Sequence, residues 1–134
     1  MGYRSDVLLA VAFRNKAEME EVMAVYAMDP RVQEDDLAKH WKLHDTDTFP
    51  MLYYKDEGIK WYSSYNHVQG MEHLAALLDK FGEERDLQYA AIAYRIGEEL
   101  DDVEVNEQHN DSLGYMQEQL WDYCGMRREI VSNF

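Results

Sequence analysis

The apolar run from Asp6 to Phe13, DVLLAVAF, constrains the fold of this chain more than any other segment. Every residue after Asp6 is apolar, which is typical of a short β-strand that is buried on both faces. Asn15 and Glu18 follow with the spacing of a capping box, which predicts the start of a helix. We expect this helix to end at Pro30. Its apolar stripe consists of Met19, Val22, Met23 and Tyr26.

The middle of the chain predicts a second helix, a hairpin and a third helix. Residues 32–45 have moderately helical spacing. Residues 49–65, FPMLYYKDEGIKWYSSY, contain two aromatic-rich parts that flank KDEG, which predicts a β-hairpin with Gly58 in a left-handed turn position. Asn66 is the expected N-cap of the next helix, and Gly82 is its expected C-terminal glycine.

The last third of the chain predicts two more strands and a C-terminal helix. Residues 86–96 form an apolar strand, and residues 102–106 alternate, with two valines on one face and acids on the other. That alternation is typical of a half-exposed edge strand. Residues 111–131 have helical spacing. The expected fold is one α+β domain over residues 1–134, with a ferredoxin-like βαββαβ core. Its antiparallel sheet has helices on one face, an extra edge strand and added helices.

The charge of the chain limits its partners. Its 134 residues carry a formal net charge of −14, so direct binding to nucleic acid or to an anionic membrane is disfavoured by repulsion. A basic protein is the favoured partner. Cys124 is the only cysteine, which excludes an internal disulfide and a cysteine-based zinc site and agrees with a reducing compartment. The chain has no signal-peptide pattern and no stretch long enough to span a membrane, so we expect a cytoplasmic protein.

The sequence contains no convincing metal or catalytic motif. His40 and His44 stand four residues apart, but Trp41 occupies the position where a zinc protease has its glutamate. The acids at residues 98–111 lack the central glycine of a calcium-binding loop. A contiguous solvated run of acids does not provide the unlike environments that acid–base catalysis needs. Cys124 is interpreted as a packing residue. We therefore expect no metal, no cofactor and no enzymatic activity.

Three segments of the chain resemble a group of small bacteriophage proteins. In that group a GYRS-(D/E)-V strand, a KWY-x-S-Y element and an RIGE-x-x-DD-(I/V) element recur in this order. The matching residues here are Gly2–Val7, Lys60–Tyr65 and Arg95–Val103. The resemblance implies a phage accessory protein that acts in the cytoplasm of a bacterial host, and it implies no catalytic residues.

The first functional hypothesis is a non-enzymatic protein that binds and modulates or inhibits a basic host protein, such as one that handles nucleic acid or acts in defence. Carboxylates presented where phosphates would lie could make it a DNA mimic. The acidic contact candidates are Glu98, Glu99, Asp101, Asp102, Glu104 and Glu107, and a second acidic patch comprises Glu34, Asp35 and Asp36. Rigid aromatic side chains suit the desolvated centre of such a surface. The aromatic candidates are Trp61, Tyr62 and Tyr65.

Two other hypotheses remain open. A small-ligand or nucleotide-binding module would use an arginine–aromatic site made of Arg4, Trp61, Tyr65 and Arg95. A mixed pocket of these residues would favour this module, whereas continuous carboxylates on a convex face would favour the mimic. The third hypothesis is a small enzyme without a recognisable motif. Nothing in the sequence favours one oligomeric state over another.

Overall fold

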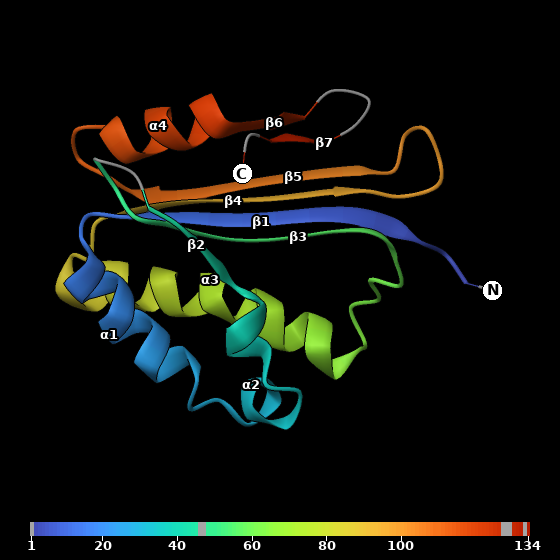
Figure 1. The fold of residues 1–134 in the computed structure, drawn as a ribbon, viewed down its shortest axis with the longest axis horizontal. Coiled ribbons are helices and arrows are strands. Elements are labelled where there is room, and N and C mark those ends of the chain that lie inside the picture. Colours follow the sequence, from blue (N-terminus) through green and yellow to red (C-terminus); the bar gives the residue numbers. More distant parts are fainter. Residues whose placement is uncertain (1, 46–47, 127–129, 133) are drawn as a thin grey trace.

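Strand β1 (Ser5–Phe13) is the central strand of a five-stranded antiparallel sheet (Figure 1). The computed structural model describes residues 2–45, 48–126, 130–132 and 134. The strand order in the sheet is β2-β3-β1-β4-β5. The flanking strands are β2 (Lys42–His44), β3 (Met51–Ile59), β4 (Tyr89–Ile96) and β5 (Val103–Asn110). The central position of β1 and the edge position of β5 are both as predicted.

One face of the sheet is covered by helices α1 (Lys16–Tyr26), α2 (Pro30–Glu34) and α3 (Asn66–Arg85), together with the 3-10 helix η1 (Leu37–His40). Side chains of β1 alternate between the two faces. Leu9, Val11 and Phe13 join the core cluster under these helices, where Leu74 and Leu78 of α3 also lie. The N-cap of α1 is confirmed, because the Asn15 side chain accepts a hydrogen bond from the Glu18 amide at 2.9 Å.

The other face of the sheet is also covered, so the expectation of helices on one face was wrong. Helix α4 (Tyr115–Tyr123) and a hairpin of β6 (Cys124–Met126) and β7 (Ile130–Ser132) lie there (Figure 1). Leu8, Ala10 and Ala12 of β1 pack into this second core with Met116, Leu120 and Cys124. A strand that is apolar on both sides needs cover on both sides. The helix expected over residues 111–131 was therefore too long: among its described residues only Tyr115–Tyr123 are helical, and β6 and β7 follow them.

The helix expected over residues 32–45 does not form. Asp36 adopts a left-handed conformation with φ 51°, which interrupts the chain between α2 and η1. Residues Lys42–His44 then pair with β3 as the short edge strand β2. Leu37 and Trp41 are buried, as an apolar helix face would require, but they reach the core from a 3-10 turn and its end.

The hairpin expected over residues 49–65 is also wrong. Met51–Ile59 is one continuous strand that pairs with β1, and KDEG lies within it. Lys55, Asp56 and Glu57 are exposed, and β2 pairs with β3 only at Met51–Tyr53. Gly58 is left-handed, with φ 62°, as predicted, but it faces the irregular register at Ser5 instead of closing a turn. Residues Lys60–Tyr65 form the connection to α3.

Several helix ends differ from those expected. Helix α1 ends at Tyr26, and Pro30 is the first residue of α2, where its missing N–H does no harm. Asn66 is the first residue of α3 and not its N-cap. Gly82 lies inside α3, whose C-cap is the left-handed Asp86. An aspartate can adopt this conformation at modest cost, so glycine is not required there.

Candidate functional site

Residues of the segments Gly2–Val7, Lys60–Tyr65 and Arg95–Val103 meet at one end of the sheet. The Tyr3 amide donates to the Tyr62 hydroxyl at 2.6 Å, and the Tyr3 hydroxyl donates to a carboxylate oxygen of Asp102 at 2.6 Å. Arg95 binds the same carboxylate. We call Tyr3, Tyr62, Arg95 and Asp102 the Tyr3 junction. It joins residues 59 and 99 positions apart in the sequence.

Arg95 is the charged centre of the Tyr3 junction. Its guanidinium donates to both oxygens of Asp102, at 3.1 and 2.6 Å, and to Glu104 at 2.9 Å. It also donates to the Ser5 hydroxyl at 3.1 Å, and its side chain is only 15% exposed. Hydrogen bonds from Arg95 and then Tyr3 lower the pKa of Asp102, and the bonds to Asp102 and Glu104 raise the pKa of Arg95. Arg95 is thus already engaged by two carboxylates.

The Tyr3 junction fixes the turn between β4 and β5. Gly97 donates its amide to the Asp102 carbonyl at 2.8 Å, and the Asp102 amide donates to the Glu99 carbonyl at 3.0 Å. The Glu99 amide donates to the Tyr3 hydroxyl at 3.1 Å. A Cβ atom on Gly97 would collide with Tyr3 and Asp102, so this close approach requires glycine. The turn therefore has a defined conformation before any partner arrives.

The tip of this turn presents an apolar side chain among acids. Leu100 is 99% exposed, and Glu98, Glu99 and Asp101 around it are exposed. We call residues 98–101 the acidic turn. Among the side chains of the acidic turn, only that of Glu98 has a hydrogen bond to another described residue, because it accepts the Arg4 amide at 3.2 Å.

The acids of β5 do not continue as a row along one side of the strand. Glu104 pairs with Arg95 in the register of the sheet, on the side that faces α3, and the following residues on that side are Asn106 and Gln108. Glu107 pairs with Ile92, whose side chain belongs to the α4 side. Val103 and Val105 share that α4 side and are 40% and 50% exposed. Carboxylates with phosphate-like spacing are therefore confined to the start of β5.

The aromatic candidates are packed against neighbouring side chains. Trp61 stacks on Tyr54 with ring centroids 6.0 Å apart and lies against the core under the helices. Tyr62 and Tyr65 meet edge to face at 5.0 Å, and all three candidates are partly buried. These three aromatic side chains pack within the connection to α3. They are less exposed than the residues of the acidic turn.

The four residues of the arginine–aromatic hypothesis lie outside the three cavities described below. Arg4 is exposed and donates to the Gly58 carbonyl at 2.9 Å, while Arg95 is held by carboxylates. The structure has cavities of about 510, 530 and 440 Å³ among its described residues, and neither Arg4, Trp61, Tyr65 nor Arg95 lines any of these three.

The second acidic patch is partly neutralised by neighbours. Glu34 accepts from the Asn66 side chain at 3.2 Å, and Asp36 lies 3.5 Å from the Lys39 ammonium. Asp35 is exposed and lines the smallest of the three cavities. These acids follow the end of α2 and do not join the acidic turn in any interaction described here.

The two histidines considered as metal ligands do not share a helical face. His40 ends η1 and lies edge to face with Tyr54, whereas His44 belongs to β2 and packs against Tyr123 and Phe134. Within the described part of the chain, no group of three His, Cys, Asp or Glu side chains is placed to hold a metal ion. No helix in the same part is both long enough and apolar enough to cross a bilayer.

The sequence did not identify Tyr3 as a site residue, although Tyr3 belongs to the GYRS segment.

Comparison of the chain with protein-family models, with curated proteins and with solved structures found no match in any of the three. The geometry of the Tyr3 junction and of the acidic turn is therefore the basis for a functional proposal.

Proposed function

We propose that this chain is a non-enzymatic binding protein that captures a basic partner protein through its acidic turn. The observation that carries the proposal is the almost complete exposure of Leu100 on a turn that the Tyr3 junction holds in place. A large apolar side chain at the tip of a fixed turn is suited to fill a pocket on a partner. Glu98, Glu99 and Asp101 surround it with negative charge.

Pre-organisation makes the turn a better ligand. A turn that is already ordered loses less conformational entropy on binding than a free loop would. The net charge of −14 and the local carboxylates attract a basic surface at long range and raise the association rate. Leu100 would then supply the desolvated contact that slows dissociation.

The proposal divides five of the six acidic candidates into two groups and leaves out Glu107, which lies opposite Ile92 farther along β5. Glu98, Glu99 and Asp101 contact the partner. Asp102 and Glu104 position the turn through Arg95. This division replaces the continuous phosphate-like row with a short cluster around one apolar anchor.

The resemblance to bacteriophage proteins supports a more specific setting. In that setting the chain is a phage accessory protein in the cytoplasm of a bacterial host. Its partner is a basic host protein that handles nucleic acid or acts in defence, and the acidic turn occupies part of the surface where phosphates would bind. The charge of the chain supports this choice over direct contact with nucleic acid.

We also propose that β1, β2, β3 and β4 with α1 and α3 form a ferredoxin-like core. The spatial order β2-β3-β1-β4 and the antiparallel pairing of β1 with both neighbours support this assignment. Strand β5 then extends the sheet beyond β4, and this extension creates the hairpin that carries the acidic turn.

The test compares two triple variants that remove the same charge. The turn variant carries Glu98→Gln, Glu99→Gln and Asp101→Asn. The control variant carries Glu20→Gln, Glu83→Gln and Glu84→Gln, which are exposed acids of α1 and α3. A tagged wild-type chain is used to capture partners from bacterial lysate, and the purified partner is then used for association kinetics across a salt series.

We expect the turn variant to associate at least about tenfold more slowly than the wild type at low salt, because it loses local steering. The control variant should stay within about twofold. Leu100→Ala should mainly speed dissociation. If the turn and control variants slow association equally, only the net charge matters and the acidic turn is not the binding surface.

A further inference from the structure

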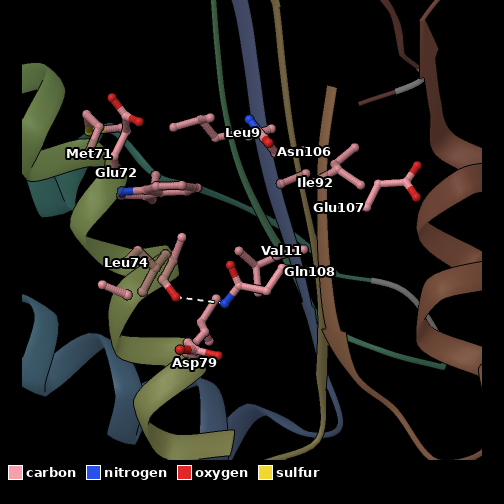
Figure 2. Close-up of a pocket in the computed structure, with 17 residues that line it drawn as sticks. Leu9, Val11, Met71, Glu72, Leu74, Asp79, Ile92, Asn106, Glu107 and Gln108 are labelled. Carbon is pink, nitrogen blue, oxygen red and sulfur yellow. Dashed lines mark hydrogen bonds between the residues drawn. The ribbon is translucent and has the colours of Figure 1, made fainter. Parts of the chain in front are cut away.

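A cavity of about 510 Å³ lies between α3 and the β4–β5 side of the sheet (Figure 2). On α3 it is lined by Glu72, Ala75, Ala76 and Asp79, whose spacing places them on one face of the helix. The sheet provides an apolar floor that includes Leu9, Val11, Ala91 and Ala93. Asn106 and Gln108 of β5 form the opposite wall.

The cavity exists because small residues face each other across this part of the core. Alanines occupy α3 at positions 75 and 76 and β4 at positions 91 and 93, so the helix and the strands leave space between them. Gln108 spans that space and donates to the Ala75 carbonyl at 2.8 Å (Figure 2). It also donates to the Tyr89 hydroxyl at 2.8 Å. This bridge keeps α3 at a fixed distance from β5 and divides the Glu72 end of the cavity from the Asp79 end.

The Glu72 end combines an apolar interior with a negative rim. The Trp41 ring is buried and contributes a wall, while Leu9 and Ala93 contribute the floor. Burial raises the pKa of Glu72, and the nearby charge of Glu104 raises it further. No Lys or Arg is among the described residues that line the cavity. Arg95 already binds Glu104, so a positive group placed here would pair with the Glu72 carboxylate.

We propose that this cavity binds a small apolar primary amine, with its ammonium group at Glu72 and its hydrocarbon body against Leu9, Trp41 and Ala93. The size of the cavity suits a small ligand. An ammonium donates a charge-assisted hydrogen bond to a carboxylate, and its apolar body gains from leaving water. The aromatic face of Trp41 favours a cation over an anion nearby. The Asn106 side chain adds a polar group on the opposite wall.

This site is separate from the acidic turn. Glu72 and the alanines lie on α3 and β4 and make no hydrogen bond to the Tyr3 junction in an interaction described here. The one link is electrostatic, from Glu72 to Glu104, which Arg95 also binds. Amine binding and partner capture through Leu100 therefore use different residues, and the two proposals can fail separately.

The test uses three probes with similar hydrocarbon bodies: n-pentylamine, n-pentanol and pentanoate. Each is titrated into nitrogen-15-labelled protein and followed by amide chemical shifts. We expect n-pentylamine to bind saturably and to shift the amides of Ala75, Ala91, Ala93 and Gln108. The affinity for n-pentanol should be about tenfold or more lower than that for n-pentylamine, because n-pentanol cannot form the charge-assisted contact. Pentanoate should not bind.

Two variants localise the site. Glu72→Gln should lower the affinity for n-pentylamine about tenfold and leave the affinity for n-pentanol unchanged. Ala93→Leu should fill the floor and abolish binding of both. Glu83→Gln, on the same helix but outside the lining, is the matched control and should bind as the wild type does. The triple variant of the acidic turn should also bind n-pentylamine normally.

Equal affinity for n-pentylamine and n-pentanol in the wild type would overturn the amine assignment. Saturable binding whose shifts lie away from α3 and β4 would overturn the location. Absence of saturable n-pentylamine binding would overturn the proposal as a whole. None of these outcomes depends on whether Ala93→Leu folds, because each is read from the wild type.

Discussion

The hydroxyl group of Tyr3 lies 2.6 Å from a carboxylate oxygen of Asp102 and donates a hydrogen bond to it. The same hydroxyl accepts the Glu99 amide at 3.1 Å. One side chain near the start of the chain thus holds two points of the hairpin between β4 and β5. The acidic turn owes its conformation to this arrangement, which makes Tyr3 the first residue to test.

Tyr3→Phe should lower the free energy of unfolding, because it removes one hydroxyl that makes two hydrogen bonds. Urea denaturation followed by circular dichroism measures the loss. Tyr115→Phe is the matched control, since the Tyr115 side chain is 57% exposed. Equal unfolding free energies for the two variants would show that Tyr3 does not stabilise the hairpin.

Acid should weaken the fold in part through Asp102. Hydrogen bonds from Arg95 and Tyr3 lower the pKa of Asp102 below its ordinary value of 3.8. The charged carboxylate therefore stabilises the folded state above that value, and the contribution is lost as pH falls through the lowered pKa. Asp102→Asn should be less stable than the wild type at neutral pH and lose less stability below about pH 4.

Urea midpoints measured from about pH 7 to about pH 2 test this prediction. Asp101→Asn is the control, because it removes the neighbouring exposed acid. If Asp101→Asn and Asp102→Asn give parallel pH curves, the pairing with Arg95 has no special effect on acid stability.

Glu72→Gln should stabilise the protein at neutral pH. Burial and the charge of Glu104 raise the pKa of Glu72 above its ordinary value of 4.5, so its charged form opposes folding as pH rises through and above 4.5. Solvent screens this half-exposed group, and the gain should stay below about 1 kcal/mol. It should vanish below pH 4.5. Thermal melting at both pH values, with Glu83→Gln alongside, checks the sign, and a lower melting temperature at neutral pH would contradict it.

Gly97→Ala should disturb the acidic turn. A methyl group at this position meets Tyr3 and Asp102, whereas a methyl group on Gly125 meets nothing within 4 Å. We expect Gly97→Ala to cost about 1–3 kcal/mol and Gly125→Ala to cost little. Amide exchange of residues 98–103 should accelerate only in Gly97→Ala. Unchanged exchange there would mean that the turn tolerates the methyl group.

Cys124 should be unreactive in the native protein. Burial raises the pKa of its thiol to about 12, and its sulfur lies 3.2 Å from the Leu120 carbonyl as a donor. Alkylation by iodoacetamide near pH 8 should be at least about a hundredfold slower than in urea, because the thiolate is the reactive form. Rapid modification of the folded protein would show that the second core opens easily.

The sequence predicts the elements whose signals are local. The apolar run of β1, the Asn15 cap and the alternation of β5 were all interpreted correctly, because each depends on neighbouring residues. The hairpin prediction failed because KDEG has turn composition, yet its pairing partner is β1, more than forty positions away. The prediction of a helix over residues 32–45 failed because the left-handed conformation of Asp36 has no distinct sequence signal.

The candidate site was predictable in outline only. The sequence located the acid run, and it identified Arg95 as a candidate residue. It could not show that Arg95 binds both Asp102 and Glu104, because this depends on their positions in the β4–β5 register. The cavity at Glu72 gave no signal, because alanines are common in helices and strands and reveal a hollow only when two surfaces are brought together.

The central position of β1 has a consequence for synthesis on the ribosome. This strand is translated before the other strands of the sheet, but its two neighbours are β3 and β4, and β4 begins only at Tyr89. Until then at least one edge of a strand that is apolar from Val7 to Phe13 is unpaired, and such an edge is prone to wrong association. A stalled nascent chain that ends before β4 should therefore recruit holding chaperones more strongly than one that extends past β5.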